Sequence, residues 1–314
     1  FFSTINIIPL LFIGIFLLRL SGQGLMSHTA STTVSRYFEK TRGKALSITW
    51  LGLSAAEFIL PVMMVFLLTF INWRDIWVYL SLLVLIFLPL ASFTLVKQLK
   101  LDSREKSLEN TKSQNLSIKE WTRLEVLKDY RFYIISLNML SLPSIATGVF
   151  VYQSFILTSK NWGPFIMAQS FMVYSVMSVI TLSISGFLID KYTSRKLLIY
   201  MNIPLFLAAL ILHFFNSPYS SFIFLGLIGV SNGFANVLGS STWAEIYGVK
   251  YIGGIKALTS GLMVFATALG TAIFGILIDD GYTINSIAVF SAIYIVIIVL
   301  LLFLYRKKIE PIYI

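Results

Sequence analysis

Two ionisable side chains interrupt long apolar stretches in the first part of the sequence. Arg19 lies 17 residues before Arg36, or about 25 Å of helix, and Glu57 lies 13 residues after Lys44, or about 20 Å. An ionised side chain inside lipid costs roughly 2.5–3.5 kcal/mol, so such residues are usually functional. We expect an Arg19–Glu57 ion pair with Gln23 on the Arg19 face. This chemistry suits binding of a carboxylate or proton coupling; the alternative is a buried pair that only locks two helices.

The composition indicates which medium surrounds these residues. Of 314 residues, 57% are hydrophobic and only 12% are charged, whereas soluble domains carry about 25% charged residues. A soluble core of this size cannot hide so much apolar surface, so we predict a membrane protein. The chain has no Cys and two His, which argues against disulfides and metal sites. No P-loop or other enzyme signature occurs, so we predict neither an enzyme nor a bound cofactor.

Apolar stretches of about 20 residues predict roughly nine membrane-spanning helices. They lie near residues 7–35, 45–71, 76–96, 132–158, 165–189, 197–216, 219–245, 257–279 and 284–305.

Lys and Arg alternate with these spans in one sense. Of the 24 cations, 21 fall on one side, Arg74 and Lys160 fall on the other, and Arg19 lies inside a span. This asymmetry places the basic side in the cytoplasm and predicts a multi-pass protein of the plasma (inner) membrane. It also explains the net charge of +10 without a nucleic-acid partner.

A polar stretch separates three spans from six. Residues 97–131 read as a cytoplasmic linker whose later part is a short amphipathic helix at the lipid headgroups. Ser117 and Glu120 fit a capping box for this helix. The predicted organisation is a helical bundle over 1–96, the linker, a six-helix bundle over 132–308 and a cytoplasmic tail over 309–314.

Two segments of the sequence echo each other. Residues 31–46 and 241–258 both carry Ser-Thr, an aromatic six residues later (Tyr37 and Tyr247), a Gly, and Lys-Ala-Leu at the start of the next span. Duplicated halves are typical of secondary transporters. If the halves match, the first half lacks three spans, and since the sequence begins with Phe1 we expect a fragment.

These residues together resemble the major facilitator superfamily, over essentially the whole chain as its helices four to twelve. The signature turn G-x-x-x-D-(R/K)-x-G-(R/K)-(R/K) is matched by Gly186, Asp190, Lys191 and Arg195, while Thr193 stands where Gly is usual and Ser194 where a cation is usual. Arg19, followed by Gln23-Gly24, is similar to the R-x-x-x-G motif of the fourth helix, with the Gly displaced by one.

The resemblance implies a cytoplasmic gate at the signature turn. Its members would be Gly186, Asp190, Lys191, Arg195, Lys196 and Glu245. Physically, Asp190 can pair with Arg195 or Lys196, or lie at the N-terminus of a facing helix, where the helix dipole favours a carboxylate. The alternative to a gate is a simple positive-inside anchor.

The resemblance also implies a central cavity lined by polar side chains. The predicted substrate-binding or coupling residues are Arg19, Gln23, Glu57, Asn138, Tyr152, Gln153, Asn232, Asn236 and Trp243. The alternative for each is a hydrogen bond that only packs helices.

The predicted protein is an all-α secondary transporter that works as a monomer in a lipid bilayer. Arg19 and the scarcity of intramembrane acids favour a small organic anion, such as a monocarboxylate, carried with a proton. The antiporter pattern G-x-x-x-G-P is not reproduced in residues 52–61. A hydrophobic-drug exchanger of the same family and a non-transporting sensor or scaffold remain as alternatives.

Overall fold

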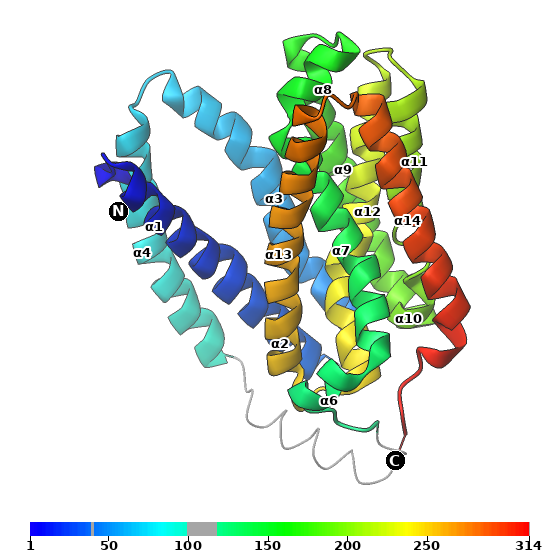
Figure 1. The fold of residues 1–314 in the computed structure, drawn as a ribbon. Coiled ribbons are helices and arrows are strands. Elements are labelled where there is room, and N and C mark those ends of the chain that lie inside the picture. The colour runs from blue at the N-terminus through cyan, green and yellow to red at the C-terminus, as the bar shows by residue number, and fades with distance from the viewer. Residues whose placement is uncertain (39–40, 99–117, 314) are drawn as a thin grey trace. The chain divides into compact units, whose positions relative to one another are not determined.

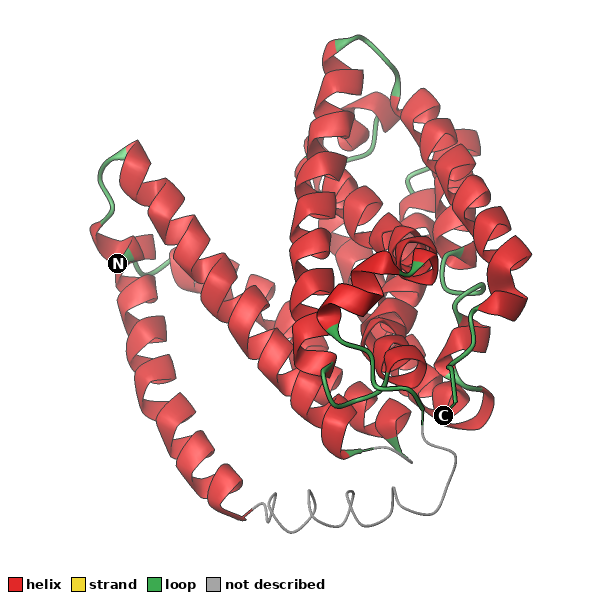
Figure 2. Cartoon of the chain, turned by 60° about the horizontal axis from the view of Figure 1, so that its bottom comes forward, coloured by secondary structure: helices red, strands yellow, loops and turns green. Residues whose placement is uncertain are grey.

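The computed structural model describes residues 1–38, 41–98 and 118–313, which are helical apart from connections and one antiparallel bridge between Ile118 and Tyr313 (Figure 2). Lys40 and Ser117, which entered the sequence-based predictions, lie outside the described residues. The chain divides into a smaller unit, residues 1–29 and 56–117, and a larger unit, residues 30–55 and 118–314. The division at the linker 97–131 stays a prediction.

The larger unit is a bundle of long helices (Figure 1). Residues 30–55 of this unit come from α2 (Ser27–Tyr37) and α3 (Arg42–Leu68). Its other helices are α6 (Arg123–Lys128), α7 (Tyr130–Val151), α8 (Gln153–Lys160), α9 (Pro164–Tyr192), α10 (Ser194–Leu197), α11 (Ile203–Phe214), α12 (Ser220–Tyr247), α13 (Ile252–Asp279) and α14 (Ile284–Tyr305).

Small residues set the closest helix packing in this unit. A Cβ on Gly229 or Gly233 of α12 would collide with the backbone of α9, at the carbonyl oxygens of Tyr174 and Ser178. The Asn232 amide donates to the Ser178 hydroxyl at 3.0 Å across the same contact. In lipid, where apolar burial gains little, such close approach and interhelical hydrogen bonds hold helices together.

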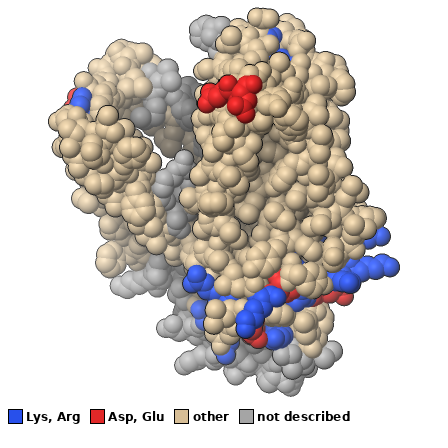
Figure 3. Space-filling view, viewed as in Figure 1, with Lys and Arg blue, Asp and Glu red and all other residues tan. Residues whose placement is uncertain are grey.

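The two ends of the larger unit differ in charge. Lys and Arg side chains gather at the end where α9, α12 and α14 finish and α7 and α13 begin, the lower end in Figure 3. We call this the basic end. At the opposite end Lys160 is buried, and its ammonium donates to the Phe215 carbonyl at 3.1 Å and to Asn216 Oδ1 at 2.8 Å. Burial lowers the pKa of Lys160 below its ordinary value.

The smaller unit is more open and strongly apolar. Phe2 stacks on Trp77 at 4.9 Å, and Arg74 donates to the Ile5 carbonyl at 3.3 Å and to Asn6 Oδ1 at 3.0 Å. The unit holds η1 (Phe2–Thr4), α1 (Ile8–Leu18), a π-helical stretch η2 (Arg19–Met26), α3 from Ala56 onward, and α4 (Trp73–Gln98).

The exposed surface of both units is that of a membrane protein. Large apolar side chains face outward, including Phe93 at 77% and Leu304 at 75% exposure. Seven helices in the described part are long and apolar enough to cross a membrane. The span predicted at 45–71 corresponds to α3, some of whose side chains are not among those described. The span predicted at 197–216 corresponds to α11, a helix of 12 residues that follows a turn. The predicted all-α polytopic membrane architecture is confirmed.

The capping box in the linker lies elsewhere than predicted. Thr122, not Ser117, caps the short helix α6: its hydroxyl accepts from the Glu125 backbone N–H, and the Glu125 carboxylate accepts from the Thr122 backbone N–H at 2.8 Å. Residue 120 precedes this helix in extended chain. Among the apolar side chains of α6, Val126 is fully buried and Leu124 is 71% exposed.

The Glu125 cap predicts a pH dependence of stability. Hydrogen bonds from Thr122 and from Lys119 lower the pKa of Glu125 from 4.5 to about 2. A carboxylate whose pKa is lowered by folding stabilises the folded state at any pH above its pKa in the unfolded chain. This stabilisation is lost as the pH falls from about 4.5 to about 2. In thermal unfolding in detergent, the Glu125→Gln variant should therefore have a lower melting temperature than the parent at pH 7. Near pH 2 the two melting temperatures should be equal. An equal difference at both pH values would contradict the cap.

Candidate functional site at the basic end

The carboxylate of Asp190 lies at the N-terminus of α3. It accepts the backbone N–H of Gly43 at 2.8 Å and that of Lys44 at 3.1 Å. First-turn N–H groups have no partner within their own helix, and the helix dipole adds a partial positive charge there. Of the two arrangements that the sequence allowed, the structure has the second, in which the Asp190 carboxylate lies at the N-terminus of a facing helix.

A glycine crossing brings the two helices into reach of this contact. A Cβ on Gly43 would fall deep inside contact distance of the Gly186 carbonyl oxygen and 2.9 Å from Asp190 Oδ1. Ser47, one turn further along α3, donates its hydroxyl to the Leu182 carbonyl at 2.6 Å. We call Gly43, Ser47, Gly186 and Asp190 the α3–α9 crossing. Its geometry explains why the signature turn begins with Gly186.

Glu245 organises the other side of the same turn. Its carboxylate accepts the backbone N–H of Ser194 at 2.7 Å and the Ser194 hydroxyl, and it lies 3.3 Å from the guanidinium Nε of Arg195. Lys191 and Lys196 are exposed, and the Lys191 ammonium lies over the Tyr192 ring. The half-buried Glu245 therefore binds Ser194 and Arg195 of the turn. Lys191 and Lys196 are exposed, as expected for a positive-inside anchor.

Thr193 adopts the backbone conformation of the glycine that it replaces in the signature turn. Its φ is 74° and its ψ is 146°, a region that is essentially restricted to Gly. Its hydroxyl is buried without a hydrogen-bond partner among the described residues. The turn thus keeps its tight geometry at the cost of local strain.

Relief of this strain is a testable prediction. Thr193→Gly should stabilise the protein by about 1 kcal/mol, because the strain released exceeds the entropy that a Gly adds to the unfolded chain. Thr267→Gly, inside α13, should destabilise by about 1 kcal/mol. Unfolding by SDS in detergent micelles measures both changes. Destabilisation by both substitutions would contradict the assigned strain.

A second charged cluster at the basic end was missed from the sequence. Arg131 and Asp129 form a buried ion pair at 2.7 Å, and the Tyr247 hydroxyl donates to Asp129 at 3.1 Å. Arg131 also donates to the Glu310 carbonyl at 2.6 Å, which ties the C-terminal segment to α7. The sequence prediction counted Arg131 among the basic linker residues; the D-x-R spacing at the start of a span was the available signal.

The two echo segments lie against each other in the larger unit. Tyr37 and Tyr247 are the last residues of α2 and α12. Lys256 is 4% exposed and donates to the Ser35 hydroxyl at 3.1 Å, which joins the end of α2 to the start of α13. The described part of the first echo segment thus contacts the second at the basic end.

Three of the predicted cavity residues are already used in packing. The Asn138 amide donates to the Leu198 carbonyl at 3.1 Å and accepts from Asn202 at 3.0 Å. Asn232 binds Ser178 as described, and Trp243 is 2% exposed and stacks on Tyr247. Their polar groups are occupied or enclosed in this conformation.

The other three predicted residues of the larger unit keep hydrogen-bonding capacity. Tyr152, Gln153 and Asn236 are half-buried, and their side chains make no hydrogen bond within the described part of the chain. Tyr152 and Gln153 lie at the break between α7 and α8.

The Arg19 region has an unusual backbone. Residues Arg19–Met26 form a π-helical stretch, with the Ser21 hydroxyl bonded to the Leu17 carbonyl at 2.8 Å. Extended π-helix is rare and is common at functional sites. The side chains of Arg19, Gln23 and Glu57 lie outside the description, so their predicted pairing stays a prediction.

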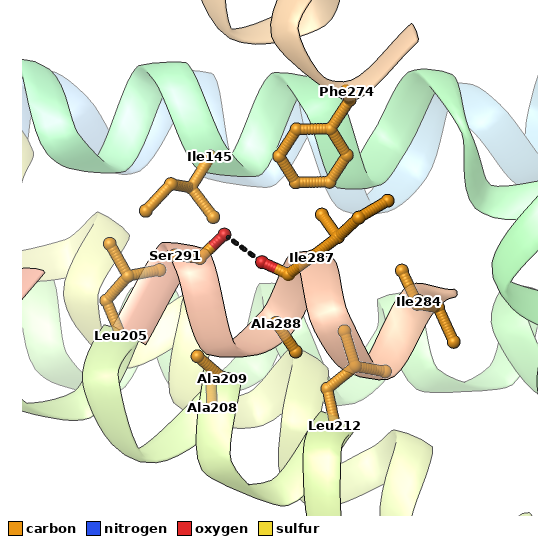
Figure 4. Close-up of a pocket in the computed structure, with 10 residues that line it drawn as sticks. All are labelled: Ile145, Leu205, Ala208, Ala209, Leu212, Phe274, Ile284, Ile287, Ala288 and Ser291. Atoms are coloured by element: carbon orange, nitrogen blue, oxygen red, sulfur yellow. Dashed lines mark hydrogen bonds between the residues drawn. The ribbon is translucent and has the colours of Figure 1, made fainter. Parts of the chain in front are cut away.

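A small apolar cavity in the larger unit does not suit a polar ligand. One cavity, between α7, α11, α13 and α14, has about 10 Å³ of space, and its only polar lining residue, Ser291, donates to the Ile287 carbonyl at 2.9 Å (Figure 4). This volume is about that of one water, so we interpret it as a packing defect. Among the described residues no cluster of His, Asp and Glu could hold a metal ion.

An apolar helical bundle with a glycine crossing and a charged turn at one end is the architecture of a polytopic membrane protein. The sequence matches the family described as Major Facilitator Superfamily over residues 1–253. The chain belongs to the major facilitator superfamily, whose members are generally secondary transporters of small solutes rather than enzymes. No curated protein sequence matches the chain.

Proposed function

We propose that this chain carries a small organic anion, such as a monocarboxylate, together with a proton, by alternating access. The α3–α9 crossing carries the proposal. A carboxylate held by two N–H groups joins segments 147 residues apart in sequence, and no covalent bond prevents its release. Two such charge-assisted contacts are strong enough to favour one state and weak enough to break during a transport cycle.

The solute class rests on Arg19 in its π-helical stretch. A fixed cation at membrane depth favours a negatively charged solute, and Glu57 is then its partner or the proton carrier. Within the larger unit, Tyr152, Gln153 and Asn236 have hydrogen-bonding groups left to offer the solute. Lys191, Lys196 and the other exposed cations orient the basic end toward the cytoplasm of an inner membrane. The transporting unit is a monomer.

Flux into proteoliposomes tests this function. Uptake of radiolabelled lactate and acetate should rise when the outside is acidified, and Arg19→Ala should reduce it at least tenfold. Arg306→Ala removes an exposed cation at the end of α14 and should leave uptake unchanged. Uptake independent of pH and of Arg19 would contradict the anion and proton assignment, and flux of hydrophobic drugs in its place would favour an exchanger.

A further inference from the structure

A basic pocket opens at the end of the larger unit, apart from the α3–α9 crossing. Its volume is about 350 Å³, within the usual range for small-molecule sites. The wall is built from α2, α6, the connection after α12 and the first turn of α13. The lining residues are Thr32, Arg36, Arg123, Val249, Lys250, Tyr251, Ile252, Gly253 and Gly254.

The charge of the pocket is positive. Arg36, Arg123 and Lys250 line it, and no Asp or Glu does. Glu120, the acidic group beside this wall, directs its carboxylate to the Lys250 backbone N–H at 2.8 Å. Three cations in the lining favour an anion with several oxygens, which arginine guanidinium groups bind in a bidentate manner.

Two glycines form part of the pocket wall. Cβ atoms on Gly253 and Gly254 would make only ordinary contacts, 3.8 Å from Thr32 and 4.0 Å from Arg123, so this wall is not crowded by α2 or α6. The Thr32 hydroxyl has no hydrogen-bond partner within the described residues. Tyr251, 42% exposed beneath the Lys250 ammonium at 5.3 Å, has the placement of an aromatic residue at the membrane interface.

We propose that this pocket binds a phosphate group, either of an anionic phospholipid headgroup or of a small soluble phosphate. Bound phosphate joins three segments far apart in sequence: the end of α2, the linker helix α6 and the start of α13. It thereby stabilises the basic end. None of its lining residues belongs to the proposed solute-binding set, so the proposal does not depend on which solute is carried.

Ligand-dependent thermal unfolding of the purified chain in uncharged detergent tests the proposal. One titration uses inorganic phosphate against sodium chloride at equal ionic strength, and a second uses phosphatidylglycerol against phosphatidylcholine. The parent should show saturable stabilisation by one probe. Arg36→Gln/Arg123→Gln should raise the half-saturating concentration at least tenfold, since each cation near a charged lipid surface contributes about 1 kcal/mol. Lys250→Gln provides a milder change if the double variant folds poorly.

A matched control removes two cations from the same end but not from the pocket. Lys307 and Lys308 are exposed and do not line it, so Lys307→Gln/Lys308→Gln should retain the parent response. Stabilisation by phosphatidylglycerol alone identifies a lipid site, and stabilisation by inorganic phosphate identifies a soluble ligand. No saturable stabilisation by either probe, or an equal loss in pocket and control variants, overturns the proposal.

Discussion

Gly43→Ala should abolish closure of the basic end, with a fall in solute flux of at least tenfold. The added methyl would collide with the backbone carbonyl of Gly186, which cannot rotate away as a side chain does. Relief requires α3 and α9 to separate, and the two N–H contacts to Asp190 are then lost. Overpacking costs about 1–3 kcal/mol, and each hydrogen bond to a charged group contributes about 1.5–3 kcal/mol. Even 3 kcal/mol lowers the closed population about 100-fold relative to the open one.

The same helix offers a matched control for this prediction. A Cβ on Gly52 would have no atom within 4 Å, so Gly52→Ala should leave flux and stability near the parent values. Since the chain has no Cys, a pair of cysteines at Lys44 and Phe187 can report closure by cross-linking. The Lys44 ammonium lies 4.9 Å from the Phe187 ring centre. Cross-linking should persist with Gly52→Ala and fall with Gly43→Ala; equal yields would contradict the crossing.

The membrane helices followed from the sequence because lipid imposes one simple requirement, a long apolar run. The runs from 219–245 and 284–305 became α12 and α14 with ends shifted by at most two residues. These two helices thus needed no tertiary information, whereas the run 132–158 is broken into α7 and α8 and the run 197–216 gives the shorter α11. The family followed from the signature turn in the same way, since its residues are contiguous in sequence.

Contacts between segments far apart in the chain could not be predicted from the sequence. Asp190 has cations five and six residues away, yet the N-terminus of α3 binds it, because helix packing brings two N–H donors within 3.1 Å. The sequence named both arrangements but offered nothing to decide between them. The partner of Arg195, Glu245, lies 50 residues further along the chain.

The capping-box error has a similar origin. Ser117–Glu120 and Thr122–Glu125 both fit the sequence pattern. The backbone N–H groups of Lys119 and Trp121 donate to the carbonyls of Ile312 and Tyr247, at 2.7 and 3.1 Å. These contacts hold residues 118–121 in extended chain, so the helix begins only after Thr122. The competing partner was the C-terminal segment, about 190 residues away, which no local pattern reveals.

The C-terminal segment is held by Arg131, and replacing this residue should have the second large effect. Arg131→Met should destabilise the protein by about 3–5 kcal/mol, since it leaves the Asp129 carboxylate buried without its counter-charge. The guanidinium also holds the Glu310 carbonyl, so residues 309–313 should detach from α7 and become sensitive to carboxypeptidase. SDS unfolding in micelles and protease digestion measure the two effects.

A double-mutant cycle separates the ion pair from simple loss of packing. Asp129→Asn removes the charge but keeps hydrogen-bonding groups: its amide oxygen can accept from the backbone N–H of residue 131, and its NH2 can donate to the Tyr247 hydroxyl oxygen. Arg131→Met/Asp129→Asn should therefore be more stable than Arg131→Met alone, with a coupling energy of about 1–3 kcal/mol. Arg306→Met, an exposed cation over the Phe303 ring, should change stability by less than about 1 kcal/mol. Additive effects at 129 and 131 would show that Arg131 acts through its packing alone, and the charge assignment at this end of α7 would then be wrong.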